Sequence, residues 1–509
     1  MTTVSYGDDR RAGIPGSWQR LAGDREAFLA SALIAAFVAL ALYSVDRGTP
    51  HADEVMYAET SANIAAGKGA VAWTHANVVP GTANALTYVP FVYAEALWIR
   101  TFGLSRVVVE SFGILVIAAA TWLFWAFLRR SQLVHGPISR LFLTASLPMV
   151  PSVMTLWGTN RYDVIAVFGC ALAAWATSRR ASRSRLALIG LAGILVGGDG
   201  FHPAIIMPGL AGVAWLWGGR KDTGALIAFV AGVASGLALT FGEMYASGTL
   251  GVFRTLMVHN SVGVRSLSTV LAGPLVGHSN FRDNALTMLA LGIAAASASI
   301  RTRTPQRSPA AFVGMAAGVI VPMTLTFVGR YYHTYSWLAV LPAFLLAVMA
   351  AEGRGVGRLA RWAIYSLLAL DALSGLPTRV GMVALEADRN SYEAPSSYIR
   401  EVLEADDVVY ASYIAYYPVK AVAAESFFGG AIDSMTSGQL ASVSKAVLAD
   451  DSKPRAMFEL PQAEVLARLG GEWAEVGHFR VARGEWRMML PRPPKESAIF
   501  DFKVFRRKP

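Results

Sequence analysis

Side chains able to exchange protons are concentrated directly after the first long apolar run of the chain. The segment His51–Glu59 (HADEVMYAE) holds three acids within seven residues. The pattern predicts a short helix that ends at Gly67, on which Asp53 and Tyr57 share one face. A carboxylate placed where a helix leaves a membrane can act as a general base on a bound hydroxyl. The alternative interpretation is that Asp53 and Glu54 only stabilise the start of the helix through its dipole.

The composition indicates that such a site would belong to a membrane protein. Of 509 residues, 54% are hydrophobic and 16% are charged, against about 25% charged in a soluble domain, and mean hydropathy is +0.43. These values exclude a disordered chain, a coiled coil, a small disulfide-rich domain and an ordinary cytosolic enzyme. The single cysteine, Cys170, excludes an internal disulfide and a cysteine-built metal site. The net charge of +10 marks cytoplasmic loops rather than a nucleic-acid partner.

The apolar runs predict about eleven membrane-spanning helices, since a span needs roughly 20 mostly apolar residues. The runs lie at about 27–45, 106–128, 141–157, 163–178, 186–198, 202–217, 223–247, 284–300, 310–328, 335–351 and 362–376. Residues 84–100 are ambiguous, because Pro90 and Glu95 interrupt them. If this segment does not cross, the arginine-rich loops all face the cytoplasm, as the positive-inside rule requires. We therefore expect a surface or re-entrant helix there.

The chain is expected to form an all-α polytopic membrane bundle followed by a small α/β domain. We predict a cytoplasmic N-terminal tail over residues 1–26, a membrane domain over 27–377 whose outer loop 46–105 carries surface helices, and an extracytoplasmic domain over 378–509. The expected location is a bacterial inner membrane. The C-terminal domain contains two predicted strands and a helix, over Val408–Ala411, Phe500–Arg506 and Ala463–Leu469 respectively.

The segment around Asp53 resembles the first outer loop of the GT-C glycosyltransferases. The resemblance rests on Asp53-Glu54, Tyr57-Ala58-Glu59 and Gly67 directly after the first span, on Val79–Pro90, and on Phe102–Arg106. The most similar pattern is that of the protein O-mannosyltransferases and the lipid A aminoarabinose transferases. The resemblance implies a polytopic helical fold with surface helices in the first loop, a sugar on a polyprenyl phosphate as donor, and Asp53 as the catalytic carboxylate.

Two further implications of the resemblance concern neighbouring residues. The family places an acid at a position similar to Asp163, so we expect Asp163 to orient the acceptor or the catalytic acid. In the aminoarabinose enzymes an acidic and a basic residue stand before the proline that is similar to Pro90, whereas Tyr88-Val89 hold that place here. The resemblance therefore extends neither to a metal ligand at that position nor to a preference for aminoarabinose. The metal ligands stay unknown, and a divalent cation stays open as a cofactor.

The predicted site combines three catalytic residues, Asp53, Glu54 and Asp163, with a larger set that binds substrate. Arginines on the outer loops are expected to bind the donor phosphate, because the guanidinium offers a planar fork to phosphate oxygens. For the aromatic and histidine members, the alternative is an interfacial belt or a solvated surface. The substrate-binding set is His51, Tyr57, Glu59, Tyr88, Arg161, His202, Arg265, Arg282, Arg330, Tyr332 and His333.

Together these features predict an integral-membrane glycosyltransferase that uses a polyprenyl-phosphate sugar. Asp53 would take a proton from the acceptor hydroxyl, and a single displacement would invert the anomeric centre. The acceptor is expected to be a glycan, a lipid or a protein. Membrane lipids are further partners, no nucleic acid is expected, and we expect a monomer. The sequence holds no P-loop and no dinucleotide fingerprint that would indicate a nucleotide-sugar donor.

Three other functions fit parts of the sequence. A transporter or lipid flippase would favour charges near the bilayer midplane and paired repeats, whereas the ionisable residues here gather at the outer boundary. A membrane O-acyltransferase would centre on a buried histidine, and His202 lies at a predicted turn. The C-terminal domain could be the functional unit with the helices as its anchor, although so many spans exceed what an anchor needs.

Overall fold

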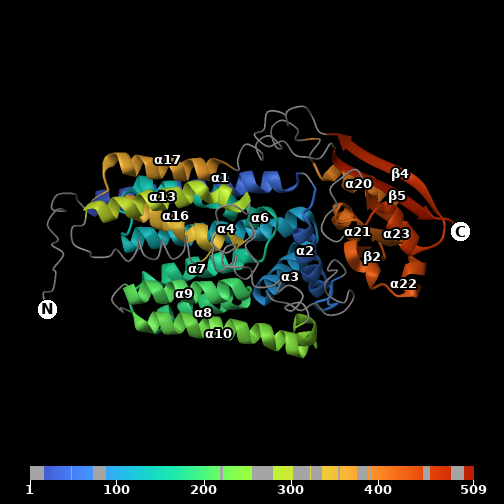
Figure 1. Cartoon of the computed structure of the whole chain (residues 1–509), viewed down its shortest axis with the longest axis horizontal. Helices are drawn as coiled ribbons and strands as arrows, with labels where there is room; N and C mark the ends of the chain where they lie inside the picture. Colours follow the sequence, from blue (N-terminus) through green and yellow to red (C-terminus); the bar gives the residue numbers. More distant parts are fainter. Residues whose placement is uncertain are drawn as a thin grey trace, which may run out of the picture.

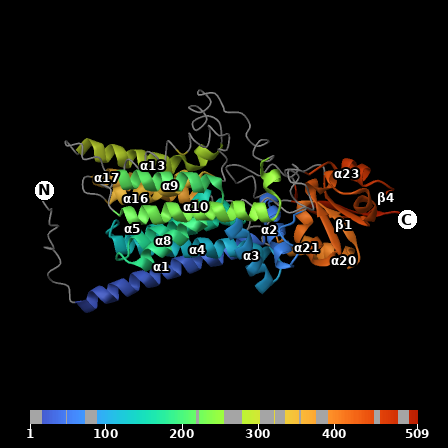
Figure 2. The same ribbon diagram turned by 90° about the horizontal axis from the view of Figure 1, so that it is seen from below.

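A bundle of helices and a smaller α/β unit lie end to end along the long axis of the molecule (Figure 1). Figure 2 shows the same order from a second direction, with α2 and α3 between the two parts. This computed structural model describes residues 16–47, 49–72, 88–217, 222–254, 279–301, 321, 335–352, 356–374, 388, 391–450, 459–482 and 498–509.

Helices occupy the predicted apolar runs wherever the structure describes them. The run 310–328 lies almost entirely outside the described residues. The bundle helices are α1 (Gly16–Val45), α4 (Arg106–Ser131), α5 (Pro137–Ser146), η1 (Leu147–Met149), α6 (Pro151–Gly158), α7 (Asp163–Thr177), α8 (Arg183–Gly198), α9 (Phe201–Trp217), α10 (Thr223–Ala246), α13 (Ser279–Arg301), α16 (Trp337–Ala351) and α17 (Arg358–Ser374). Helix α1 begins inside the predicted tail 1–26, and Glu26 is buried there against Arg140, with 2.7 Å between Oε2 and the guanidinium.

The predicted count of about eleven spans is not confirmed. Among the described residues, three helices are long and apolar enough to cross a membrane, within Asp24–Val45, Arg106–Ser131 and Thr223–Ala246. The helix pair Pro137–Met149 and Pro151–Gly158 is a fourth candidate, bent by 53°. Other apolar helices are shorter, such as α7 with 15 residues. At 1.5 Å per residue such a helix covers about 22 Å of a hydrocarbon layer of about 30 Å.

Small residues allow α8 and α10 to pack backbone against backbone. A Cβ atom added at Gly193 would lie 2.3 Å from the Phe229 carbonyl oxygen, and one added at Gly197 would lie 2.2 Å from the Val233 carbonyl oxygen. Close helix approach through small residues is typical of membrane bundles. The end of α8 also packs closely against the start of α3. A Cβ atom added at Gly198 would lie 2.7 Å from the Pro90 ring.

Two helices of the loop 46–105 separate the bundle from the α/β unit. They are α2 (Ala52–Ala65) and α3 (Val89–Phe102). The 14 residues of α3 span about 21 Å, too short to cross a hydrocarbon layer of about 30 Å. This length agrees with the predicted surface helix at 84–100. On α2, Tyr57 packs into the core of the bundle, whereas Val55 and Ala58 pack into the core of the α/β unit.

The α/β unit contains a five-stranded sheet of order β2-β1-β3-β5-β4. Strand β1 runs parallel to β2 and β3, and β5 runs antiparallel to β3 and β4. The two strands and the helix predicted in this region are confirmed. The elements are α20 (Glu393–Val402), β1 (Val408–Ala411), η6 (Tyr413–Ala415), α21 (Tyr416–Val422), β2 (Glu425–Phe428), η7 (Gly429–Asp433), α22 (Ser437–Ser442), β3 (Lys445–Ala449), α23 (Gln462–Leu469), β4 (Trp473–Ala482) and β5 (Ala498–Arg507).

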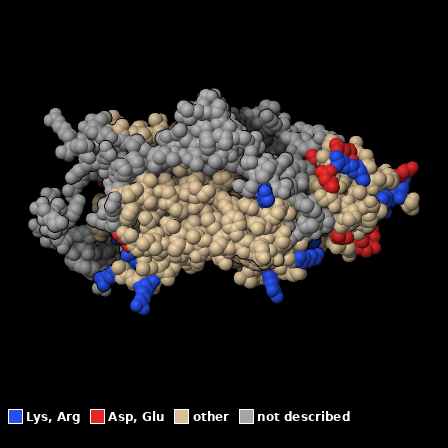
Figure 3. Space-filling model, turned by 60° about the horizontal axis from the view of Figure 1, so that its bottom comes forward, with Lys and Arg blue, Asp and Glu red and all other residues tan. Residues whose placement is uncertain are grey.

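The charge distribution on the surface separates the two parts. On the face shown in Figure 3, the described Lys and Arg side chains of the helical part lie near its two ends, with an uncharged band between them. Acidic and basic side chains are mixed on the α/β unit. An uncharged belt of this kind is what contact with lipid requires.

Candidate active site

The first turn of α2 fixes two neighbouring carboxylates in different directions. His51 is the N-cap residue, and its Nδ1 accepts a hydrogen bond of 3.2 Å from the Asp53 amide. The Glu54 carboxylate closes a capping box by accepting a hydrogen bond of 3.1 Å from the His51 amide. Glu54 therefore stabilises the start of the helix through this hydrogen bond. The Asp53 carboxylate points away from the cap toward another part of the chain.

Asp53 belongs to a cluster that we call the Arg161 cluster, formed by Asp53, Arg161 and Asp163. One guanidinium joins both carboxylates, with 2.5 Å to Asp53 Oδ2 and 3.0 Å to Asp163 Oδ2. Trp337 Nε1 donates a hydrogen bond of 3.1 Å to the other oxygen of Asp163. Side-chain exposure is 0% for Asp163, 4% for Arg161 and 24% for Asp53. Asp53 is thus the member of the cluster that solvent can reach.

A tight turn between α6 and α7 brings Arg161 to this position. Asn160 has a φ of 46°, in the left-handed region where asparagine is tolerated. The Arg161 amide then donates to the Leu156 carbonyl at 2.9 Å, which closes the turn. Asp163 follows as the first residue of α7. The sequence Asn160-Arg161-Tyr162-Asp163 therefore positions a cation and an acid side by side.

Aromatic rings surround the Arg161 guanidinium. Its central carbon lies 5.1 to 6.0 Å from the ring centroids of Tyr57, Tyr162 and Tyr335, within the range of cation–π attraction. Tyr88 stacks on Tyr162 with 4.8 Å between centroids. Burial holds the pKa of Tyr57 well above its ordinary value. The Tyr57 hydroxyl is therefore protonated at neutral pH and available as a donor rather than as a base.

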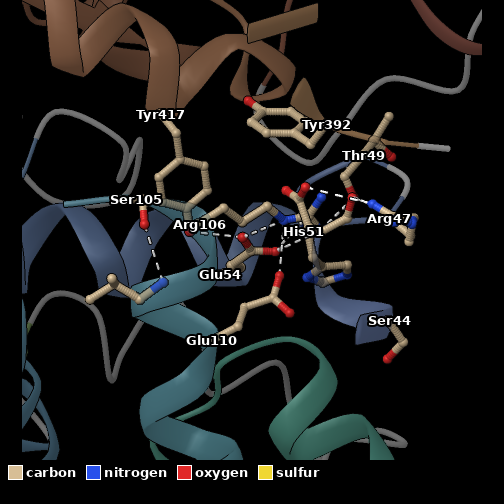
Figure 4. A network of polar contacts seen from close by, with 12 residues as sticks. Ser44, Arg47, Thr49, His51, Glu54, Ser105, Arg106, Glu110, Tyr392 and Tyr417 are labelled. Carbon is tan, nitrogen blue, oxygen red and sulfur yellow. Dashed lines mark hydrogen bonds and ion pairs between the residues drawn. The ribbon is translucent and has the colours of Figure 1, made fainter. Parts of the chain in front are cut away.

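Glu54 belongs to a second cluster, the Arg106 network, which Figure 4 shows from close by. Arg106 Nε lies 3.2 Å from Glu54 Oε1 and 2.9 Å from Glu110 Oε1. The hydroxyl of Tyr417, from α21, donates a hydrogen bond of 2.7 Å to Glu54, and the Tyr392 ring lies 5.2 Å from the guanidinium carbon. The network joins α2, α4 and the α/β unit. These contacts support a positioning role for Glu54, and its predicted catalytic role stays a prediction.

Glu59 also faces the α/β unit rather than the Arg161 cluster. Its side chain has no exposed surface, and Lys420 Nζ of α21 lies 3.5 Å from its Oε1. A buried carboxylate is costly unless it is paired. The contact therefore favours a role in joining the two parts of the molecule, and the predicted role of Glu59 in substrate binding stays a prediction.

A further buried acid, Glu95 of α3, was not among the predicted site residues. Its carboxylate accepts hydrogen bonds from Ser61 of α2, at 2.6 Å, and from Asn160 of the turn that carries Arg161. Burial raises the pKa of Glu95 to about 7, although these hydrogen bonds oppose the rise. Glu95 thus links the helix that carries Asp53 to the turn that carries Arg161. The one signal in the sequence was an acid in the middle of an apolar helix.

The structure brings together about half of the predicted site. Asp53, Asp163, Arg161, Tyr57 and Tyr88 are joined by the contacts given above, and the His202 ring lies 4.4 Å from the Tyr335 ring. His51, Glu54 and Glu59 serve the helix cap and the α/β contact. The remaining predicted residues lie outside the described residues, or in the case of Arg282 have a described backbone in α13 only: Arg265, Arg282, Arg330, Tyr332 and His333.

The described residues contain one group with the side-chain types of a metal site. Ligand atoms of Asp450, His478 and Asp501, all in the α/β unit, lie within 4.8 Å of one another. Asp501 is already neutralised in part, because Arg480 Nε lies 3.3 Å from its Oδ2. In the Arg161 cluster, the guanidinium lies between the two carboxylates.

Comparison with known proteins reveals likeness in structure only. No protein-family model and no curated protein sequence matches the chain. The crystal structure of ArnT from Cupriavidus metallidurans bound to undecaprenyl phosphate matches with a TM-score of 0.55 at 13% identity, covering 93% of this chain and 97% of that one.

Two other solved structures match with lower scores. They are the arabinofuranosyltransferase AftD from Mycobacteria, with a TM-score of 0.49, 14% identity and 94% of this chain covered, and the archaeal oligosaccharyltransferase AglB from Archaeoglobus fulgidus, with 0.43, 12% and 82%. The match covers 40% of the AftD chain and 69% of the AglB chain. On the strength of the match to ArnT, the chain has the fold of the GT-C glycosyltransferases.

Proposed function

We propose that this membrane protein is a glycosyltransferase that moves a sugar from a polyprenyl-phosphate donor to an acceptor hydroxyl. The observation that carries the proposal is the Arg161 cluster, in which a partly exposed carboxylate and a buried guanidinium lie 2.5 Å apart. These are the two groups that such a transfer needs, a base for the acceptor and a cation for the leaving phosphate. The shared fold with an undecaprenyl-phosphate-bound protein supports the choice of donor.

Donor binding frees Asp53 in this mechanism. While Arg161 holds the Asp53 carboxylate, the bonded oxygen is not open to the proton of an acceptor hydroxyl. A phosphate group of the donor competes for the same guanidinium, which suits phosphate oxygens as well as carboxylate oxygens. When Arg161 turns to the phosphate, the Asp53 oxygen is released and can accept a hydrogen bond from the acceptor hydroxyl. Asp163, itself held by the Trp337 indole, keeps the guanidinium in place throughout, because it binds Nε whereas Asp53 binds Nη1.

The transfer step then balances without a further reactant. Asp53 accepts the proton of the acceptor hydroxyl, and the oxygen forms a bond to the anomeric carbon. The bond between this carbon and the phosphate oxygen breaks, and its electron pair leaves with the polyprenyl phosphate. Arg161 stabilises the charge that develops on that phosphate. A single displacement of this kind inverts the anomeric centre.

The positions of charged side chains support an orientation in the membrane. Asp53 and the α/β unit share one end of the bundle, as the contact between Glu54 and Tyr417 requires. Arg129 and Arg130 end α4 at its other end, and Arg179 follows the end of α7. The positive-inside rule places that end in the cytoplasm. We therefore propose that transfer takes place on the extracytoplasmic side, with a glycan, lipid or protein as acceptor.

The experiment that tests this function is sugar transfer in detergent. Purified protein is incubated with polyprenyl phosphates that carry radiolabelled sugars and with candidate acceptors, and the labelled product is counted. Transfer from the lipid that is abolished in the Asp53→Asn variant supports the proposal. A transporter or flippase moves its cargo between two compartments and would transfer no sugar in detergent. Absence of transfer from every donor, together with lipid movement in vesicles, would overturn the proposal.

A further inference from the structure

A cavity of about 920 Å³ lies at the end of the bundle remote from Asp53. Its lining comes from the start of α5, from Glu352 at the end of α16, and from Val356 and the α17 residues that follow it. Helix α4 begins at Arg106, which contacts Glu54, the residue next to Asp53 in the sequence. The helix ends at Ser131, five residues before the first lining residue of the cavity, Gly136. In Figure 1 the bundle separates these helix ends from the α/β unit. The cavity is thus distinct from the Arg161 cluster.

The interior of the cavity presents a carboxylate. Glu352 Oε1 accepts a hydrogen bond of 2.8 Å from the Ser139 hydroxyl and one of 2.9 Å from the Tyr365 hydroxyl. Among the residues that the structure describes, no Lys or Arg forms an ion pair with Glu352. A partly buried carboxylate favours a cationic partner, and an ammonium group supplies both the charge and the hydrogen-bond donors.

Two arginines on α17 line the same cavity. Arg358 and Arg361 stand three residues apart, on one face of the helix. Arg361 Nε donates a hydrogen bond of 2.8 Å to the Ala351 carbonyl, which fixes the guanidinium at the end of α16. Both side chains are exposed. A pair of guanidinium groups in this position suits a phosphodiester.

Apolar walls complete the cavity. Phe142 packs against Tyr365 with 5.2 Å between ring centroids. Ile138 and Trp362, which also line the cavity, are 81% and 64% exposed. Large exposed apolar side chains beside arginines are typical of the boundary between lipid and water. The walls therefore suit acyl chains, whereas the floor and the rim suit a charged head group.

We propose that this cavity binds one phospholipid whose head group carries both a phosphodiester and a primary ammonium, as in phosphatidylethanolamine. The ammonium donates to Glu352, and the phosphodiester accepts from Arg358 and Arg361. A head group with a phosphate but no cation offers Glu352 no charged partner beyond the hydroxyls of Ser139 and Tyr365. A quaternary ammonium supplies the charge without an N–H donor. The proposal is independent of the glycosyltransferase function, because it concerns another site and a binding event without turnover.

The test is competitive binding of three lipids to the purified full-length protein, measured by native mass spectrometry. The lipids share their acyl chains and carry ethanolamine, choline or glycerol head groups. We expect the ethanolamine lipid to bind about tenfold more tightly than the other two, the value of one charge-assisted hydrogen bond. In the Glu352→Gln variant this preference disappears, whereas Arg358→Gln weakens all three lipids by about tenfold.

Two controls test whether a loss of preference comes from the cavity itself or from a general change in charge or folding. Arg183→Gln removes a charge from the same end of the bundle, outside the cavity lining, and leaves the preference unchanged. Glutamine at position 352 keeps an oxygen that can accept from Ser139 and Tyr365, and a thermal midpoint close to that of the wild type shows that the fold is intact. Equal binding of the three lipids, an unchanged preference in Glu352→Gln, or displacement of the ethanolamine lipid by polyprenyl phosphate would each overturn the proposal.

Discussion

Two clusters beside α2 each join two carboxylates through one arginine, and each takes one of its two acids from adjacent residues of this helix, Glu54 and Asp53. In the Arg106 network, Glu54 and Glu110 have at most 1% side-chain exposure and Arg106 has 6%. In the Arg161 cluster, Asp53 is 24% exposed. Successive residues of a helix point about 100° apart, so Glu54 meets the α/β unit while Asp53 meets the turn before α7.

The difference lies in how many partners each carboxylate has. Glu54 accepts hydrogen bonds from the His51 amide and the Tyr417 hydroxyl in addition to Arg106. Asp53 is held through one oxygen by the Arg161 guanidinium. A fully partnered buried ion pair resists exchange, because breaking it leaves a buried charge uncompensated. A partly exposed pair can exchange its partner for a substrate group. We therefore interpret the Arg106 network as structural and the Arg161 cluster as the candidate for chemistry.

The largest expected effect is on kcat, and it should distinguish Asp53 from Glu54. Asp53→Asn is expected to lower kcat by about 10² to 10⁴-fold, the usual contribution of a general base, while donor binding and the thermal midpoint stay close to those of the wild type. Glu54→Gln is expected to lower the thermal midpoint and to leave kcat per folded molecule within a few-fold. Sugar transfer and thermal unfolding are measured on both variants. The reverse pattern, with Glu54→Gln inactive and stable, would exchange the roles of the two acids.

The two arginines should differ in what they contribute to stability. Arg106→Met leaves Glu54 and Glu110 buried without a cation, which is expected to cost about 3–5 kcal/mol. Arg161→Met should cost less, because only Asp163 is then left fully buried without a cation, whereas water reaches Asp53. The midpoints of denaturant unfolding in one detergent compare the two variants. Equal losses would mean that the Arg161 cluster is as much a structural pair as the Arg106 network.

Glu95 provides a buried acid whose bonds come from Ser61 and Asn160 rather than from an arginine. Its pKa of about 7 lies above the ordinary value of 4.5 because of burial. Its contribution to stability is therefore complete below about pH 4.5 and is lost as pH rises through about 7. The loss is expected to reach up to about 3 kcal/mol. Unfolding of the wild type and of Glu95→Gln is compared from pH 5 to pH 8, and parallel pH profiles would contradict this interpretation.

The smallest expected effect concerns the shape of the cation at the candidate site. Arg161→Lys keeps the charge but loses the planar fork that can serve a carboxylate and a phosphate together. We expect KM for the donor to rise about tenfold, with KM for the acceptor unchanged. Initial rates at varied donor concentration measure the change. Arg179→Lys, at the other end of the bundle, is the matched control and should leave both values unchanged.

Local patterns were sufficient to predict helices over the apolar runs, two of the five described C-terminal strands (β1 and β5) and the separate members of the Arg161 cluster. Asp53 was indicated by its position after the first apolar run, and Arg161 and Asp163 by a polar turn between two apolar runs. The contact of Glu54 with the α/β unit could not be predicted from the neighbouring sequence, because its partner Tyr417 lies 363 residues away. Glu95 was visible only as an interruption of an apolar helix, since Ser61 and Asn160 approach it from other elements.

The central claim is that donor phosphate draws Arg161 away from Asp53 and so frees the base. The most direct test is a structure of the protein with a bound polyprenyl phosphate. We expect the Arg161 guanidinium to contact the phosphate and to keep its contact with Asp163, while the Asp53 carboxylate faces open space beyond hydrogen-bond distance of Arg161. A phosphate bound at the outer end of the bundle while the pair between Asp53 and Arg161 stays intact would contradict the claim.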